Sequence, residues 1–120
     1  MESVAILLKC LKSKRFIKDI EKAKDEVMTE QIQLKKADDL FIRDAITGLG
    51  TILKEDLEKH YYITTVKVGA FGNVLAQAII RRVEDKTAEL AVYAHEGLSK
   101  QHLSEKAAIK LKKVLCESNS

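Results

Sequence analysis

The chain has 120 residues, 46% of them apolar, which suits one domain with a hydrophobic core and excludes a disordered segment. It contains no Pro, no Trp and five Gly, and only 5% of its residues are aromatic, so the composition favours a mostly helical fold over an all-β protein with many turns. The 21 basic and 18 acidic residues leave a net charge of +3, which excludes a histone-like polycation and permits nucleic-acid contact without requiring it.

Helical spacing dominates the N-terminal half. Apolar residues at i, i+3, i+4 and i+7 predict a helix over residues 4–11, and a second amphipathic run extends over 16–28. Thr29 is the predicted N-cap of a further helical start. Apolar spacing predicts another helix over 37–49 and a short one over 51–59.

The composition changes after His60. Residues 61–68 are β-branched and aromatic and form the best strand candidate in the chain. A lone strand is unstable, so this one needs a partner strand, another subunit or a bound nucleic acid. Residues 69–73, with the sequence GAFGN, predict a turn from this strand into a helix; they match neither phosphate-loop pattern, although an RNA phosphate contact there is an alternative.

Residues 70–98 hold the densest small and apolar residues of the chain, and two interpretations of them compete. As one long Ala-rich helix, the stretch carries an apolar stripe with a 3-to-4 spacing. As two strands, it turns at Glu84-Asp85-Lys86. The scarcity of Gly and Pro favours the long helix. A last helix is predicted from Ser99 or Ser104 to about Leu115.

These elements predict a mainly α fold, a compact helical bundle with a long Ala-rich helix and a minor β element near residues 61–68. We expect one helical domain over residues 1–120 with a small β insert around 60–70. Cys10 and Cys116 lack a paired or metal-ligand spacing, which predicts buried thiols in a reducing compartment, and we expect a cytoplasmic protein with no membrane segment.

Residue patterns for catalysis are absent from the sequence. Histidines 60, 95 and 102 have no partner at zinc-protease spacing, and the carboxylates of 38, 39 and 44 are surrounded by basic residues. We therefore expect neither an enzyme nor a cofactor or metal.

Two basic clusters are candidates for contacts to a phosphate backbone, and solvated helix faces are the alternative. Seven basic and two acidic residues lie between Lys9 and Lys24, and a second cluster interrupts residues 70–98. On charge alone, the candidate nucleic-acid-binding residues are Lys12, Lys14, Arg15, Arg81, Arg82 and Lys86.

Two stretches carry a family resemblance. The first is VAILLKCLKSKRFIKDIEKAKD, an apolar helix followed by a basic one, and the second is LAQAIIRRVEDKTAELAVYAHEGLSKQ, a long Ala-rich helix after a short strand. This layout resembles the small subunit of archaeal type I-A CRISPR interference (Cascade) complexes, which are small, mostly helical proteins with a minor β element. The resemblance covers most of the chain as an arrangement of elements and contains no diagnostic motif.

The resemblance implies a non-catalytic subunit in antiviral defence. Its partners would be other subunits of a multi-protein effector, and it would make sequence-independent contacts to the backbone of guide RNA or target DNA. The competing hypothesis is a small helical adaptor or regulatory protein that binds a protein partner and no nucleic acid. Association of the chain with further copies of itself is another alternative.

Overall fold

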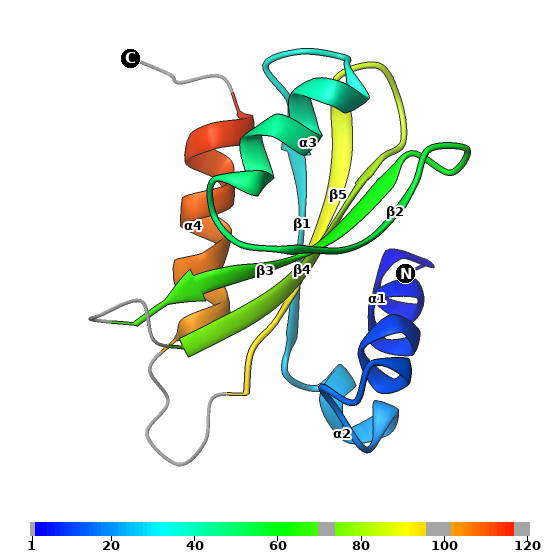
Figure 1. Ribbon diagram of the computed structural model, residues 1–120, viewed down its shortest axis with the longest axis vertical. Helices are drawn as coiled ribbons and strands as arrows, with labels where there is room; N and C mark the ends of the chain where they lie inside the picture. The colour runs from blue at the N-terminus through cyan, green and yellow to red at the C-terminus, as the bar shows by residue number, and fades with distance from the viewer. Residues whose placement is uncertain (1, 70–73, 96–101, 117–120) are drawn as a thin grey trace.

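A five-stranded antiparallel sheet forms the centre of the protein and carries helices on both faces (Figure 1). The computed structural model describes residues 2–69, 74–95 and 102–116. Along the chain the elements are α1 (Glu2–Ser13), α2 (Ile20–Lys24), β1 (Val27–Gln33), α3 (Asp39–Thr47), β2 (Ile52–Asp56), β3 (Tyr61–Val68), β4 (Val74–Arg82), β5 (Thr87–Tyr93) and α4 (Leu103–Leu115). The strand order is β1-β5-β4-β3-β2, so β1 and β2 are the edges.

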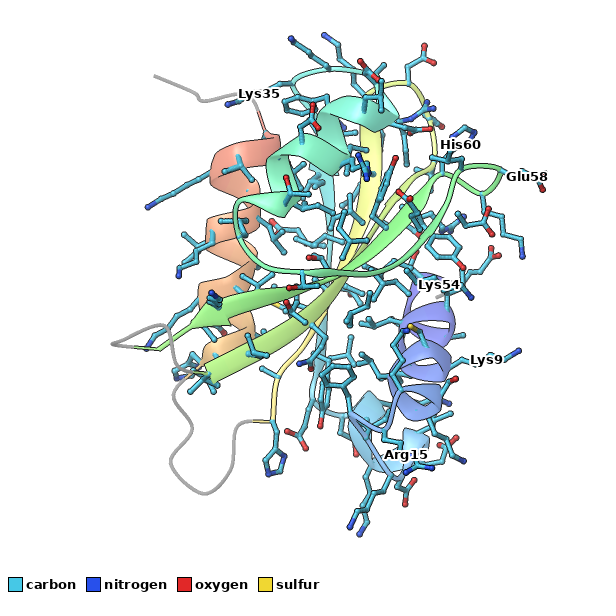
Figure 2. All side chains as sticks on the ribbon, viewed as in Figure 1. Lys9, Arg15, Lys35, Lys54, Glu58 and His60 are labelled. Atoms are coloured by element: carbon cyan, nitrogen blue, oxygen red, sulfur yellow. The ribbon has the colours of Figure 1, made fainter. Side chains whose placement is uncertain are left out.

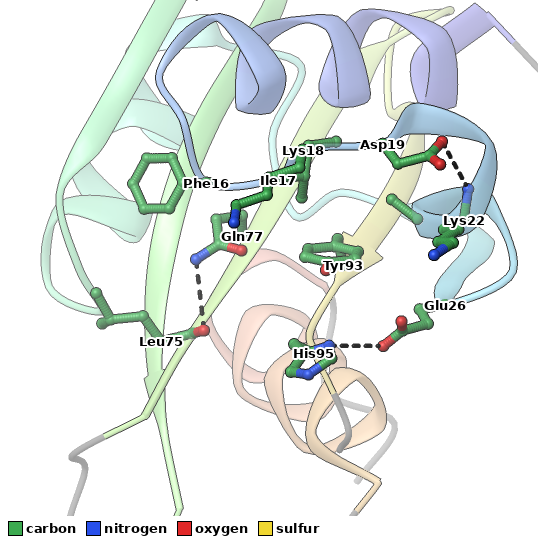
Figure 3. A pocket seen from close by; sticks show the side chains of 11 residues that line it. Phe16, Ile17, Lys18, Asp19, Lys22, Glu26, Leu75, Gln77, Tyr93 and His95 are labelled. Carbon is green, nitrogen blue, oxygen red and sulfur yellow. Dashed lines mark hydrogen bonds and ion pairs between the residues drawn. The ribbon is translucent and has the colours of Figure 1, made fainter.

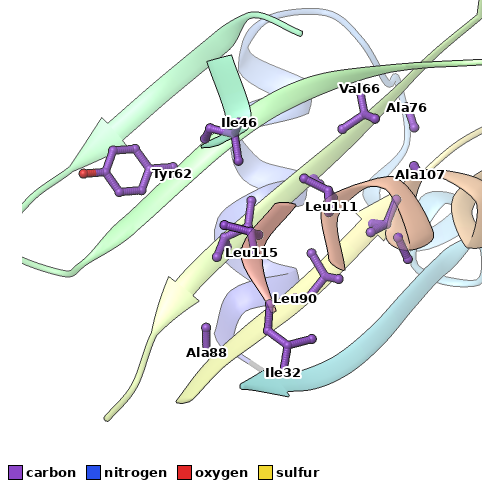
Figure 4. Packing of buried hydrophobic residues seen from close by; sticks show 14 of the residues in the cluster. Ile32, Ile46, Tyr62, Val66, Ala76, Ala88, Leu90, Ala107, Leu111 and Leu115 are labelled. Carbon is purple, nitrogen blue, oxygen red and sulfur yellow. The ribbon is translucent and has the colours of Figure 1, made fainter. Parts of the chain in front are cut away.

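Two hydrophobic cores lie on opposite faces of this sheet, because successive side chains of a strand point to opposite sides. On one face, Tyr62 and Val66 of β3 pack with the buried sides of α3 and α4 (Figure 4). On the other face, Tyr61 and Ile63 pack with α1 and α2. The central strands therefore bury both faces, which is why their sequences are apolar almost without interruption.

The prediction of a mainly α helical bundle is wrong, and residues 70–98 account for most of the error. The described part of this stretch forms β4 and β5, and the Val83 N–H donates to the Thr87 carbonyl at 2.9 Å across the turn at Glu84-Asp85-Lys86. The two-strand interpretation is therefore confirmed. A strand that is apolar on both faces also contains residues at 3-to-4 spacing, so this spacing did not distinguish it from a helix.

Three shorter helix predictions are also wrong. Residues 16–28 contain the short α2 and the first two residues of β1, and Thr29 lies within β1. Residues 51–59 contain β2, which pairs with β3. The predicted strand over 61–68 is confirmed, but β3 is part of the central sheet and not a small insert in a helical domain.

Three predicted helices are confirmed. α1 includes the predicted range 4–11 and extends beyond both of its ends, and α3 and α4 lie within the ranges predicted for them. The predicted turn over 69–73 lies, except for Gly69, outside the described residues. Among the described helices none is long and apolar enough to cross a membrane.

The backbone at Gly50 lies very close to Thr65 of β3. The chain before β2 already pairs with β3, since the Thr65 N–H donates to the Thr51 carbonyl at 2.9 Å. A Cβ at Gly50 would overlap the Thr65 carbonyl and lie 2.7 Å from Thr65 Oγ1. We expect Gly50→Ala to lower the free energy of unfolding by about 1–3 kcal/mol, the usual cost of overpacking, measured by urea denaturation.

Gly48→Ala is the matched control. Gly48 has helical backbone angles, and a Cβ there would meet only the Ala45 carbonyl at 3.8 Å, an ordinary contact. This variant should be as stable as the wild type or more stable by up to about 1 kcal/mol. Equal stability of the two variants would contradict the close approach at Gly50.

Candidate anion-binding groove

The C-terminal end of α1 fixes the direction of a strongly basic segment. The Phe16 N–H donates to the Leu11 carbonyl at 2.8 Å and the Arg15 N–H donates to the Lys12 carbonyl at 3.1 Å. Arg15 has φ 66, the left-handed conformation that closes a helix in a Schellman motif. The chain therefore leaves α1 in a defined direction, with Lys12, Lys14 and Arg15 exposed.

The hairpin of β2 and β3 brings further lysines to α1. Lys54 of β2 and Lys59 of the following loop lie beside Lys9 and Lys14 of the α1 end, around a groove of about 430 Å³. Figure 2 shows Lys9 and Lys54 on the α1 side of the sheet. The hydroxyl-bearing residues Ser13 and Tyr61 complete a polar lining. Segments about forty residues apart in the sequence thus build one basic groove.

The ammonium groups of the four groove lysines lack ion pairs within the described part of the chain. No described acidic residue lines the groove. Burial raises the pKa of the Cys10 thiol at the groove's base, while the nearby charges of Lys14 and Lys54 act to lower it. The groove therefore concentrates positive charge that an anion can use.

Arg81 occupies a different position from the one predicted. Its guanidinium donates to Glu89 Oε1 at 2.7 Å and to Ser3 Oγ at 2.9 Å, and its side chain is 19% exposed. The hydrogen bond from Ser3, and the bond and charge of Arg81, hold the pKa of Glu89 below its usual value although burial opposes them. Arg81 therefore ties β4 to β5 and α1.

Arg82 serves the opposite face of the sheet. Its Nε donates to Asp39 Oδ1 at 3.1 Å, and His60 Nδ1 lies 2.9 Å from Asp39 Oδ2. Burial acts to raise the pKa of Asp39, but the bonds from His60 and Arg82 outweigh it, so this pKa lies below its usual value. Arg82 thus joins β4 to the start of α3.

The six predicted nucleic-acid-binding residues do not form one surface. Arg81 lies at the N-terminal end of α1, where Glu2 is 3.8 Å from its Nη1, whereas Lys14 and Arg15 follow the other end. The 12-residue helix between them is about 18 Å long. Lys86 lies in the turn before β5, where the Leu34 N–H donates to its carbonyl. Only Lys14 of the six lines the groove.

The prediction missed Lys9, Lys54 and Lys59 as members of this site. Lys9 belongs to the basic run of residues 9–24, so its charge could have identified it as a candidate. Lys54 and Lys59 lie in a segment predicted as a helix, and no local pattern places that segment beside α1. Only the pairing of β2 with β3 does so.

Comparisons of this chain with protein-family models, with curated proteins and with solved structures found no match. The groove must therefore be interpreted from its own chemistry.

The ion pair between Asp39 and Arg82 predicts how the stability of the fold depends on pH in the acid range. Because the folded pKa of Asp39 lies below the unfolded value of about 4, its ionised form stabilises the fold above that value. This contribution is lost as the pH falls through the folded pKa. We expect Asp39→Asn to be less stable than wild type at pH 7 and to lose less stability between pH 5 and pH 2, measured by urea denaturation at each pH. An unchanged pH dependence would contradict the assignment.

Proposed function

We propose that the protein binds the phosphate backbone of nucleic acid, independently of sequence, through the lysine groove between α1 and the β2–β3 hairpin. The observation that carries this proposal is the convergence of Lys9, Lys14, Lys54 and Lys59, whose ammonium groups form no ion pair with a carboxylate among the described residues. An ammonium group is a point charge that binds phosphate without reading a base.

The distribution of charge supports the same proposal. Residues 9–24 carry an excess of five positive charges, which exceeds the net charge of +3 for the whole chain. Lys54 and Lys59 lie on the same side of the sheet, in a segment that also contains Glu55, Asp56 and Glu58. The basic run of residues 9–24 thus supplies most of the positive charge beside the groove, and clustered charge attracts an extended polyanion more strongly than scattered charges do.

The small-subunit role in an RNA-guided interference complex stays a prediction. Its chemistry, phosphate contacts without sequence preference, agrees with a lysine groove, but the long helix over 70–98 that contributed to the resemblance is a pair of strands. A position of the gene beside a CRISPR array and other effector genes would support this role.

Salt dependence tests the phosphate contacts directly. Four lysine–phosphate contacts on a single strand predict a slope of about −2.8 for log K against log salt. Affinity for a fluorescein-labelled 12-nucleotide strand should therefore fall about 50-fold between 50 and 200 mM salt, measured by fluorescence anisotropy. Absence of binding at 50 mM salt would overturn the proposal.

Two double variants with the same change of net charge locate the contact. Lys9→Glu with Lys54→Glu should lower affinity at least 10-fold and reduce the salt slope by about half, because two of the four contacts are lost. Lys35→Glu with Lys36→Glu changes two exposed lysines at the surface between α3 and α4. Figure 2 shows Lys35 far from Lys9. Equal losses in the two variants would mean that overall charge, and not the groove, governs binding.

A second candidate function, association through a protein partner, is favoured by the edge strand β1. The Leu34 N–H, just after β1, donates to the Lys86 carbonyl, just before β5, so the backbone groups of even-numbered β1 residues face β5. The backbone groups of Val27, Thr29 and Gln31 therefore face outward. No described strand pairs with this edge, and only the isolated bridge between Leu34 and Cys116 covers its C-terminal end among the described residues. β1 itself has no Pro, Lys or bulge to protect it. By contrast, the edge strand β2 is short, contains Lys54 and has an irregular register.

A second copy of the chain fits this edge. A two-fold axis at Thr29 would place Thr29 opposite Thr29, and Val27 opposite Gln31, with no like charges facing each other. We expect concentration-dependent dimers in sedimentation velocity, and their loss in Gln31→Pro, which removes an outward N–H. Gln31→Ala keeps that N–H and should still dimerise. A wild type that stays monomeric at 500 µM would contradict this function.

A further inference from the structure

A second hollow lies on the same side of the sheet as the lysine groove. It has a volume of about 600 Å³, is open to solvent, and is lined by the connection from α1 to α2, by α2 and by the sheet. Figure 3 shows Phe16, Gln77 and Tyr93 around it, with Leu75 and His95 at its lower side in that view. This hollow plays no part in the phosphate contacts of the proposed function.

Two aromatic rings, Phe16 and Tyr93, and one amide, Gln77, line this hollow beside aliphatic and charged side chains. Phe16 remains 40% exposed and Leu75 45% exposed, although both are apolar. The backbone of Phe16 is held by its bond to Leu11, so the ring stands on a fixed support. Gln77 is 5% exposed, and its Nε2 makes a long 3.4 Å bond to the Leu75 carbonyl.

The charges that line the hollow nearly cancel. The positive charges of Lys18 and Lys22 are balanced by the negative charges of Asp19 and Glu26. His95 Nδ1 lies 3.5 Å from Glu26 Oε2 and forms an ion pair with it when the histidine is protonated. Asp19 also accepts the Lys22 N–H at 3.3 Å as the cap of α2. The hollow is therefore unsuited to a phosphate group. An uncharged, flat heterocycle with polar edges fits its lining, because it can stack on an aromatic ring and bond to an amide.

The hollow adjoins the lysine groove. Lys14 lines the groove and Phe16 lines the hollow, so the two sites are two residues apart and their Cα atoms are separated by at most about 7 Å. Arg15, between them, is exposed. A nucleotide whose phosphate lies near Lys14 can therefore direct its base toward Phe16.

We infer that this hollow receives an unstacked nucleobase, with Phe16 as the stacking platform and Gln77 as its polar contact, so that the protein prefers single-stranded to double-stranded nucleic acid. The inference rests on the proposed phosphate-binding function. In a duplex the bases are stacked and paired within the helix and do not reach a hollow on the protein surface, whereas a single strand can turn a base outward.

The chain offers a direct spectroscopic test because it contains no Trp. Phe16→Trp introduces a single indole at the platform and keeps an aromatic surface. Its emission should be quenched when a 12-nucleotide single strand binds, and should change little with a 12-base-pair duplex. Phe16→Leu removes the aromatic surface but keeps an apolar side chain. It should bind the single strand about 5- to 100-fold more weakly and the duplex as the wild type does.

The outcomes separate this inference from the function on which it rests. If neither strand form binds wild type at 50 mM salt, the phosphate-binding function fails. If both bind, and Phe16→Leu leaves single-strand affinity unchanged while Lys9→Glu with Lys54→Glu weakens it, the groove is correct and the base site is wrong. Urea denaturation of both Phe16 variants should match wild type, since the side chain is 40% exposed and both replacements remain apolar. A loss of stability would call for Phe16→Tyr, whose single-strand affinity must then stay within about twofold of wild type.

Discussion

The pairing of β3 with β4 organises the whole molecule. It runs without a break from Tyr61 opposite Arg81 to Val68 opposite Val74. Because side chains alternate, this one ladder presents Tyr62 and Ile80 to α3 and α4, and Ile63 and Ile79 to α1. Each fully buried Ile contributes about 1.5–3 kcal/mol from the hydrophobic effect, so both helical layers gain stability from the same two strands.

The same alternation separates cations that hold the fold from cations that remain available. Arg81 and Arg82 are neighbours in β4, so they point to opposite faces, and each is met there by a carboxylate, Glu89 or Asp39. Partly buried pairs of this kind fix neighbouring elements but leave little charge for a ligand. The groove lysines have no such described partners, and this difference distinguishes the two sets more clearly than their spacing in the sequence.

The groove and the neighbouring hollow, which both include residues at the end of α1, differ in the chemistry of their linings. Lysines on one side supply charge, while Phe16 and Gln77 on the other supply an aromatic surface and an amide within a nearly neutral lining. The Schellman turn at Arg15 lies between them and sets their relative positions. The end of α1 thus contributes residues to both the groove and the hollow.

Local sequence alone determined those elements whose pattern fits one structure only. The stripes of α1, α3 and α4 and the β-branched run of β3 were sufficient, since amphipathic spacing or β-branching left no strong alternative. The basic run that contains Lys14 was also visible. Only the tertiary structure decided the rest. β4 and β5 are buried on both faces and therefore lack the alternation that marks a strand, and Lys54 joins the groove through its pairing with a distant strand. Burial on two faces and long-range pairing are properties of the assembled sheet, and no short window of sequence contains them.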